Sequence, residues 1–319
     1  MNMSPKTPLK LYSYLARLYD VLDRRPATKR VTDHCRKCVR WLERYCSGNI
    51  ASHRFPRIEI HLSHACNLSC ESCSHYSNQH LTGVLSLETA EAWYQNWGHR
   101  LRPGSVNLLG GEPALNPTLC EHVLLARKYW PDASIHIVSN GLLLHKHPRL
   151  PETLKTIGNA ELHVSKHYNS REYELRFQGV EDLLQEWKRQ HGISIVINDS
   201  FSNWTRRYLD VNGSPKPFWD GNPRQSWGIC PGKTCVQLHE GKLWKCAPLA
   251  YLPMVKRKIG LSPEWDFYLT YQPLDAGCSS GELDEFLAGR VEAFCGMCPA
   301  SRRPFQKNNP DPIGRTPHD

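Results

Sequence analysis

Short apolar runs alternate with longer amphipathic stretches from residue 56 onward, and this alternation constrains the fold more than any other feature of the sequence. Each interval between two runs is long enough for a helical crossover, so neighbouring strands are expected to be parallel. The units are too few for an eight-unit barrel. The sequence therefore predicts an α/β fold, a partial (β/α)6-type barrel with a mostly parallel sheet. The expected strands span 57–63, 105–110, 134–139, 161–165 and 193–198.

Four amphipathic stretches between these strands are expected to form the crossover helices. Ser86 is a predicted N-cap for the first stretch, because a serine hydroxyl accepts a hydrogen bond from a free amide of the first helical turn. Asn116 and Pro117 are expected to open the second. The stretches span 86–101, 118–130, 149–158 and 172–192.

Composition divides the chain into five expected segments. The segment 199–230 is rich in Gly, Pro, Trp and Arg and shows no periodicity, which predicts a long loop. The tail has the composition of a disordered or draped segment. The segments are a basic helical extension at 1–55, the βα core at 56–200, a linker or substrate-covering loop at 201–229, a small cysteine-rich domain at 230–300 and the tail at 301–319.

Cysteine usage points to metal or redox chemistry. The thirteen cysteines are an odd number in a sequence without an apolar signal segment, so a disulfide scaffold is not expected. No apolar run reaches the roughly eighteen residues of a membrane span, and we expect a cytoplasmic protein without a membrane partner. The formal net charge of +9 indicates a nucleic-acid or phosphate partner. The indication is weak, because bound iron–sulfur clusters are negatively charged and would offset part of this charge.

Three cysteines lie within eight residues directly after the first expected strand, in the stretch CNLSCESC. A loop at this place can wrap Cys66, Cys70 and Cys73 around one metal cluster and leave a fourth coordination position open. An open position keeps a metal reactive. The alternative is a structural zinc knuckle that takes its fourth ligand from His61, His64 or His75.

The spacing Cys-x3-Cys-x2-Cys at the end of a first strand resembles the signature of the radical S-adenosylmethionine (SAM) superfamily. The resemblance implies a [4Fe–4S] cluster whose open iron is chelated by S-adenosylmethionine. It also implies reductive cleavage to a 5′-deoxyadenosyl radical, which abstracts hydrogen from the substrate. An electron donor such as flavodoxin or ferredoxin would be the redox partner.

Three further stretches match the family in the expected order. The glycine-rich motif after the second strand implies contact with the methionine amino group, and glycine lets a backbone approach a ligand closely. Polar residues after the third and fourth strands imply contacts near the ribose and carboxylate; the alternative is a solvated loop. The stretches contain Gly110, Gly111, Glu112 and Pro113, then Ser139 and Asn140, then Ser165, Lys166 and His167.

One residue departs from the family pattern. The position before the third cysteine is usually aromatic and packs near the adenine, but here it is Ser72. Tyr76 lies three residues past the third cysteine and is our predicted substitute.

The cysteines beyond residue 230 resemble the ligands of twitch and SPASM auxiliary-cluster domains. The resemblance implies one auxiliary [4Fe–4S] cluster, behind a β-hairpin in QLHEGKLWKC that turns at a glycine. Cys235 and Cys278 are spare, and either can displace Cys230 from the set. A zinc ribbon with the same sulfurs is the alternative. The expected ligands are Cys230, Cys246, Cys295 and Cys298.

The remaining cysteines leave two interpretations open. Cys35, Cys38 and Cys46 can bind a third cluster or zinc, with His34, His53 or a spare cysteine completing the shell. Alternatively they are packed thiols, because Cys35 and Cys38 lie one helical turn apart.

Together the motifs predict a radical SAM enzyme of isomerase or oxidoreductase type. Trp204, Arg206 and Arg207, combined with the basic balance, favour a nucleoside or hypermodified DNA base as substrate. A peptide or sugar substrate is the alternative within the family. A non-catalytic zinc or iron–sulfur module that binds nucleic acid is the alternative from another class.

Overall fold

The computed structural model describes residues 53–201, 205–211, 214–218 and 220–304. Cys35, Cys38, Cys46 and Trp204 lie outside these residues, so their predicted roles stay predictions.

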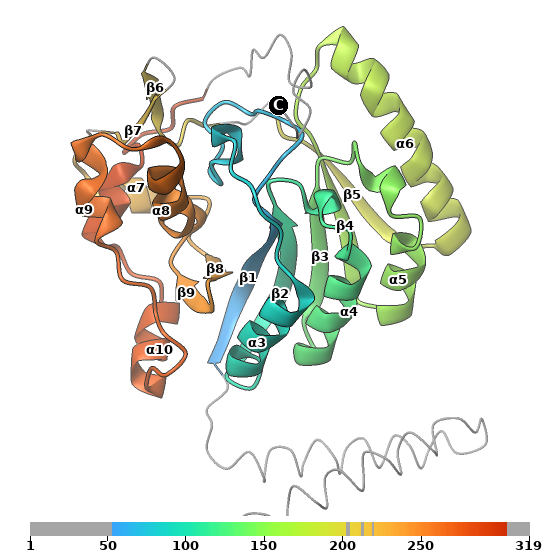
Figure 1. Cartoon of the computed structure of the whole chain (residues 1–319), viewed down its shortest axis with the longest axis horizontal. Coiled ribbons are helices and arrows are strands. Elements are labelled where there is room, and N and C mark those ends of the chain that lie inside the picture. Colours follow the sequence, from blue (N-terminus) through green and yellow to red (C-terminus); the bar gives the residue numbers. More distant parts are fainter. Residues whose placement is uncertain (1–52, 202–204, 212–213, 219, 305–319) are drawn as a thin grey trace, which may run out of the picture. The chain divides into compact units, whose positions relative to one another are not determined.

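A seven-stranded sheet runs through the centre of the fold, in the order β5-β4-β3-β2-β1-β8-β9 (Figure 1). Every neighbouring pair is parallel except β8 and β9. The sheet does not close, which confirms the predicted partial barrel. The predicted strands are β1 (His53–Ser63), β2 (Leu101–Gly110), β3 (Ser134–Ser139), β4 (Ala160–Lys166) and β5 (Ser194–Asp199).

The four crossover helices are α3 (Leu87–Trp97), α4 (Leu119–Tyr129), α5 (Leu150–Ile157) and α6 (Arg171–His191). They cover one face of the sheet (Figure 1). Ser86 caps α3 as predicted, since its hydroxyl accepts a hydrogen bond from the Thr89 amide. At α4 the N-cap residue is Thr118, whose side chain makes no capping bond. Asn116 instead accepts hydrogen bonds from the Thr118 amide and hydroxyl and ties this corner to the strands.

The two faces of the sheet differ in polarity because strand residues alternate between them. Alternate apolar side chains, such as Ile60, Leu108 and Ile137, are fully buried under the helices. The opposite face, called the inner face below, is polar. It carries Arg57, Glu59 and His61 on β1, Asn107 on β2, His136 on β3, and Glu161 and His163 on β4.

The segment 199–230 differs from the expected long loop. It contains a two-stranded ribbon, β6 (Leu209–Val211) and β7 (Ser214–Lys216), and the helix α7 (Pro223–Ile229). These elements are too short for sequence periodicity to reveal, and tertiary contacts stabilise them. Ser226 of α7, for example, donates a hydrogen bond to the Cys298 carbonyl over 2.9 Å.

The predicted hairpin is present as β8 (Cys235–His239) and β9 (Lys242–Trp244). Glu240 and Gly241 form its turn with φ of 51° and 73°, the left-handed pair that a two-residue hairpin requires. The hairpin also extends the main sheet, because Glu59 of β1 pairs with Gln237 of β8 in parallel register. The cysteine-rich segment therefore shares the sheet of the core.

A second apolar core is built mainly from residue 244 onward and includes Trp244, Tyr251, Trp265 and Met297. Their helices are α8 (Ala247–Ile259), α9 (Asp266–Leu269) and α10 (Ser280–Leu287). Short 3-10 turns lie at Ser77–Gln79, Pro113–Leu115, Leu144–Lys146, Pro263–Trp265 and Ala293–Met297. Among the described residues, no helix has both the length and the apolar character needed to cross a membrane.

Replacing Asn116 by alanine should destabilise the fold. Its buried amide donates to the carbonyls of Leu62 and Leu85, each over 2.9 Å, and both carbonyls would lose a buried partner. We expect a loss of about 2 kcal/mol in unfolding free energy, measured by anaerobic denaturant titration. Asn96→Ala, at an exposed site on α3, is the matched control. Equal denaturant midpoints for the two variants would contradict a stabilising role for the Asn116 hydrogen bonds.

Candidate active site

The three cysteines of the loop after β1 open into one cavity of about 270 Å³ at the carboxyl ends of the strands. Residues from β2, β3 and β4 complete its wall, although they lie far apart in the sequence. The lining residues are Cys66, Leu68, Cys70, Cys73, Ser74, His75, Ser77, Leu109, Gly110, Gly111, Val138, Ser139, Asn140, Ser165, His167 and Ser200.

Two of the three thiols, Cys66 and Cys70, contact polar groups of the cavity wall or the loop. The Cys66 Sγ accepts hydrogen bonds from the Leu68 amide at 3.4 Å and from the Asn140 Nδ2 at 3.8 Å. The Cys70 Sγ lies 3.6 Å from the His167 Nδ1. Burial raises the pKa of the Cys66 thiol well above its ordinary value, and the neighbouring Cys70 raises it further. A bound metal cluster would supply the positive charge that stabilises such a thiolate.

The spacing of the sulfurs argues against a single zinc ion. Tetrahedral zinc with Zn–S bonds of about 2.3 Å places two sulfurs about 3.8 Å apart. Within the residues that the structure describes, no three cysteine Sγ atoms lie within 4.8 Å of one another. The proposed histidine ligands do not complete a zinc knuckle either. His61 instead hydrogen-bonds His75 through its Nε2, and its Nδ1 lies 3.3 Å from the His64 Nδ1. As the thiols stand, a single zinc ion would require them to move closer together.

The glycine-rich motif lies against the cysteine loop, backbone to backbone. The Gly111 amide donates to the Ser63 carbonyl, and the Glu112 amide donates to the Ala65 carbonyl, each over 2.8 Å. A Cβ on Gly110 would lie 2.1 Å from the Ser63 oxygen, and one on Gly111 would lie 2.2 Å from the Ala65 oxygen. Only glycine permits this approach.

Glu112 lies beneath the cavity rather than in its wall and holds the next motif. Its carboxylate accepts hydrogen bonds from the Ser139 hydroxyl at 2.7 Å, the Asn140 amide at 2.8 Å and the Ala114 amide at 3.0 Å. Burial raises the pKa of this carboxyl, and these hydrogen bonds oppose the rise. Pro113 is also buried and outside the cavity wall.

The polar motifs after β3 and β4 divide between the cavity and the protein interior. Asn140 lines the cavity and donates from its Nδ2 to the Asn67 side chain at 2.7 Å. Ser165 and His167 also line it. Lys166 does not, because its Nζ pairs with Glu174 at 2.6 Å and lies over the Phe177 ring.

Ser72 departs from the family pattern because it has a structural partner. Its backbone is left-handed, with φ of 54°, and its side chain is buried. The hydroxyl accepts hydrogen bonds from the amides of Arg207 at 2.7 Å and Tyr208 at 3.3 Å. It thereby fastens the segment after residue 205 to the cysteine loop, which an aromatic side chain cannot do.

Tyr76 lies in the second apolar core and outside the cavity wall. Its buried ring stacks on Tyr208 with a centroid distance of 5.3 Å. Burial is the main cause that raises the pKa of its hydroxyl. The charges of Cys298 and Tyr208 raise the pKa further. The adenine contact predicted for Tyr76 has no support in this position.

Two of the four expected auxiliary ligands, Cys246 and Cys298, pack against the second core, and Cys230 and Cys295 are near enough for their charges to act on both. Burial raises the pKa of Cys246 well above its ordinary value and that of Cys298 to about 12; mutual repulsion among the four thiols adds to both shifts. Cys235 is elsewhere, with Arg57 and Glu59 as its charged neighbours. Cys278 packs against the core of the main sheet. The structure therefore groups Cys230, Cys246, Cys295 and Cys298.

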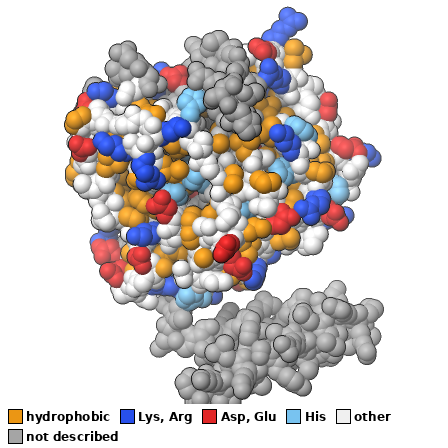
Figure 2. All heavy atoms as spheres, viewed as in Figure 1, with side chains coloured by type: hydrophobic (Ala, Val, Ile, Leu, Met, Phe, Trp, Pro, Cys, Tyr) orange, Lys and Arg blue, Asp and Glu red, His pale blue; other side chains and the backbone are white. Residues whose placement is uncertain are grey.

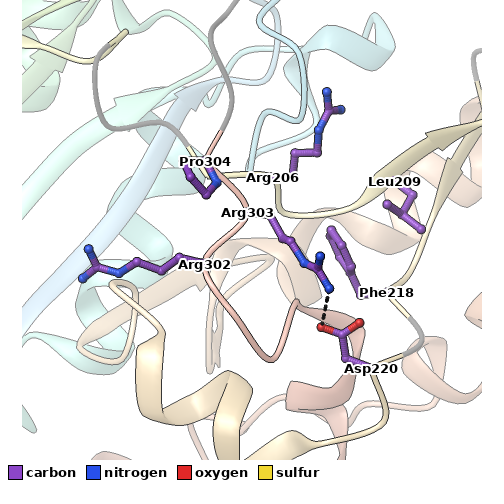
Figure 3. A pocket seen from close by; sticks show the side chains of 7 residues that line it. All are labelled: Arg206, Leu209, Phe218, Asp220, Arg302, Arg303 and Pro304. Carbon is purple, nitrogen blue, oxygen red and sulfur yellow. Dashed lines mark ion pairs between the residues drawn. The ribbon is translucent and has the colours of Figure 1, made fainter.

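An arginine-lined pocket of about 580 Å³ lies near the second core (Figure 3). Its three arginines point in different directions, and Arg303 turns toward Asp220, with 3.6 Å between the charged atoms. Arg206 pairs with Glu71 of the cysteine loop. The arginine side chains therefore do not converge on a common point where one anion could bind. The positive charge of Arg207 acts to lower the pKa of both His75 and Cys298.

Sequence reasoning missed several wall residues. Ser74, Ser77 and Ser200 carry no motif signal, and His75 was considered only as a zinc ligand. Their role depends on how the loop folds back over the strands.

The fold and this site define a class of protein: an open parallel barrel with a three-cysteine loop at the carboxyl ends of its strands. Residues 60–197 match the family model described as the Radical SAM superfamily. This domain of the chain belongs to that superfamily.

Solved structures give distant matches with TM-scores below 0.5. BtrN in complex with AdoMet and 2-DOIA is 17% identical, with 77% of this chain and 94% of that chain covered and a TM-score of 0.45. Streptococcus suis SuiB bound to S-adenosylmethionine is 12% identical, with 84% and 73% covered and a TM-score of 0.33. Native anSMEcpe with bound AdoMet and Cp18Cys peptide is 19% identical, with a TM-score of 0.35; the match covers 44% of this chain and spans 42% of that one.

Gly111→Ala should displace the cysteine loop, because its Cβ would overlap the Ala65 carbonyl. We expect the reconstituted variant to lose the iron of the cluster at this loop and to keep the auxiliary iron. Iron per chain, measured after anaerobic reconstitution, tests this. Gly179→Ala is the control, since a Cβ there meets nothing within 4 Å. Full iron content in Gly111→Ala would show that the close approach is dispensable.

Proposed function

We propose that the chain is a radical SAM enzyme that binds a [4Fe–4S] cluster through Cys66, Cys70 and Cys73 and seats S-adenosylmethionine in the adjoining cavity. The observation that carries the proposal is the convergence of these thiols with the Gly110–Gly111 backbone, Asn140 and His167 on one cavity. A structural metal module has no need for such a wall. When bound and reduced, the cluster and its cosubstrate supply a 5′-deoxyadenosyl radical for hydrogen abstraction.

The chain's own residues would position the cosubstrate. The Gly110–Gly111 backbone lines the cavity, and a Cβ at either residue would overlap a carbonyl oxygen of the segment that leads into the cysteine loop. Glu112 orients Ser139 and Asn140 from below. His167, beside the Cys70 sulfur, offers a polar contact at the far wall.

We further propose that Cys230, Cys246, Cys295 and Cys298 hold one auxiliary [4Fe–4S] cluster. The support is that Cys246 and Cys298 pack against the second core while Cys230 and Cys295 lie near enough for their charges to act on both. A zinc ribbon with the same four sulfurs is the alternative, and metal analysis of the reconstituted protein distinguishes the two. An electron donor such as flavodoxin or ferredoxin would reduce the enzyme.

The inner face favours a small polar substrate. Asn107 Oδ1 and Arg57 Nε are buried there without a hydrogen-bond partner, and buried polar groups normally have one. Both residues lie outside the cavity wall, so a substrate with hydroxyl or amino groups would satisfy these atoms once their side chains turn toward it. Sugars and nucleosides have this chemistry, and no contact of the described residues favours a peptide.

A DNA substrate has less support than the sequence suggested. Residues 1–50 contain eleven Lys and Arg against four Asp and Glu, so seven of the nine excess positive charges belong to that segment. In Figure 2, basic, acidic and apolar side chains are interspersed on the visible face and form no single basic patch. Arg206 is engaged with Glu71. The nucleic-acid interpretation therefore depends on residues outside the described part.

Substitution of any one of Cys66, Cys70 and Cys73 by alanine should abolish S-adenosylmethionine cleavage. Each variant removes one ligand of the proposed cluster. The assay is 5′-deoxyadenosine formation by reconstituted protein with dithionite, quantified by chromatography. Cys278→Ala, which removes a thiol outside both groups, should retain wild-type rates. Wild-type turnover by the triple variant, or zinc without iron in the reconstituted protein, would refute the enzyme proposal.

Cys298→Ala should separate cleavage from product formation. The variant loses an auxiliary ligand but keeps the cavity, so 5′-deoxyadenosine should still form while substrate modification is lost. Deuterium transfer from labelled candidate substrates into 5′-deoxyadenosine measures the coupling. Unchanged coupling would contradict an auxiliary-cluster role for Cys298.

A further inference from the structure

A second group of potential metal ligands lies on the inner face, apart from both cysteine groups. It consists of His136 on β3 with Glu161 and His163 on β4. His136 and Glu161 are direct register partners, and His163 is two residues further along β4. Side chains two apart on a strand share one face, so the topology brings all three together.

The three ligand atoms are close enough for one ion. The His163 Nε2 lies 3.0 Å from the Glu161 Oε2, and the His136 Nε2 lies 3.7 Å from the same oxygen. Two ligands at about 2.1 Å from a tetrahedral zinc ion are about 3.4 Å apart, between these two distances. In the described part of the chain, this is the one group of three His, Cys, Asp or Glu whose ligand atoms all lie within 4.8 Å.

Neighbouring hydroxyls hold the group in place. The Ser194 hydroxyl donates to the other Glu161 oxygen over 3.2 Å, and the Ser134 hydroxyl lies 2.9 Å from the His136 Nε2. The Ser194 contact uses the carboxylate oxygen that does not face the histidines, as outer contacts in metal sites do. The Ser134 hydroxyl shares the His136 Nε2 that faces Glu161, so an ion would have to displace it. All five residues lie on strands, which fix positions better than loops do. The positive charge of Arg57 also acts on His136 and would repel a metal cation bound there. The negative charge of Glu161 acts on His136 in the opposite direction.

We propose that His136, Glu161 and His163 form a two-histidine, one-carboxylate site for a single divalent transition-metal ion, such as Zn²⁺. Three protein ligands leave at least one coordination position open. The simpler alternative is a cross-strand network of hydrogen bonds, which needs no ion.

The site faces the same barrel interior as the cavity. Val138 and Ser165 follow His136 and His163 by two residues on the same strands and line the cavity. Two residues of strand span about 7 Å. An ion here would bind a hydroxyl, amine or carboxylate of a substrate that reaches from the cavity; this role rests on the proposed function, whereas metal binding does not.

The test is zinc binding by the cluster-loaded protein. Reconstituted wild-type chain is incubated with Zn²⁺ and desalted, and zinc and iron are counted in the same sample. We expect about one zinc per chain beyond full iron, and at least a tenfold weaker affinity in Glu161→Gln and His163→Ala. Glu152→Gln and His145→Ala, at exposed positions, are the matched controls and should bind as wild type.

Zinc-edge X-ray absorption identifies the ligands. Nitrogen and oxygen neighbours at about 2.0–2.1 Å would support the site, whereas sulfur at about 2.3 Å would place the zinc on cysteines and overturn it. Absence of zinc in the wild type, or equal affinity in the Glu161→Gln variant, would also overturn it. Because Glu161→Gln preserves side-chain size, it guards against loss through misfolding. S-Adenosylmethionine cleavage, measured in parallel, tests the proposed function separately.

Discussion

The close approach of two backbone segments at the carboxyl ends of β1 and β2 supports the rest of the site. Gly110 and Gly111 lie so near Ser63 and Ala65 that a methyl group at either glycine would overlap a carbonyl oxygen. Two backbone hydrogen bonds join the segments, from the Gly111 amide to Ser63 and from the Glu112 amide to Ala65. They fix the position of the cysteine loop at the edge of the sheet. Glu112, next in the chain, then reaches under the cavity to hold Ser139 and Asn140. One contact therefore aligns three separate motifs.

The cysteine loop also connects the two cores. Ser72 binds the amides at 207 and 208, and this brings Tyr208 onto Tyr76. Both tyrosines belong to the core that holds Cys246 and Cys298. A residue that departs from the family pattern is thus the anchor through which one cysteine group is placed relative to the other. The departure makes sense physically, since a small hydroxyl can cap two amides and an aromatic ring cannot.

The hairpin β8–β9 gives the fold a continuous polar inner face. By pairing with β1 it places Gln237 beside Glu59, and the two side chains are 2.7 Å apart. Tyr251 of α8 closes this end through a hydrogen bond to Gln237. This polar face is then bounded by residues from both cysteine-bearing parts of the chain.

The sequence alone determined the five parallel strands, their helices, the helix cap at Ser86 and the three-cysteine motif. These are local: alternation, capping chemistry and spacing act within a few residues, so the chain carries them in order. Tertiary structure decided the rest. It buried Glu112 and Tyr76, turned Lys166 away, divided the spare cysteines from the grouped ones, and brought His136, Glu161 and His163 together across two strands. Periodicity cannot reveal such pairings, because they depend on register between segments and on which side chain finds a partner.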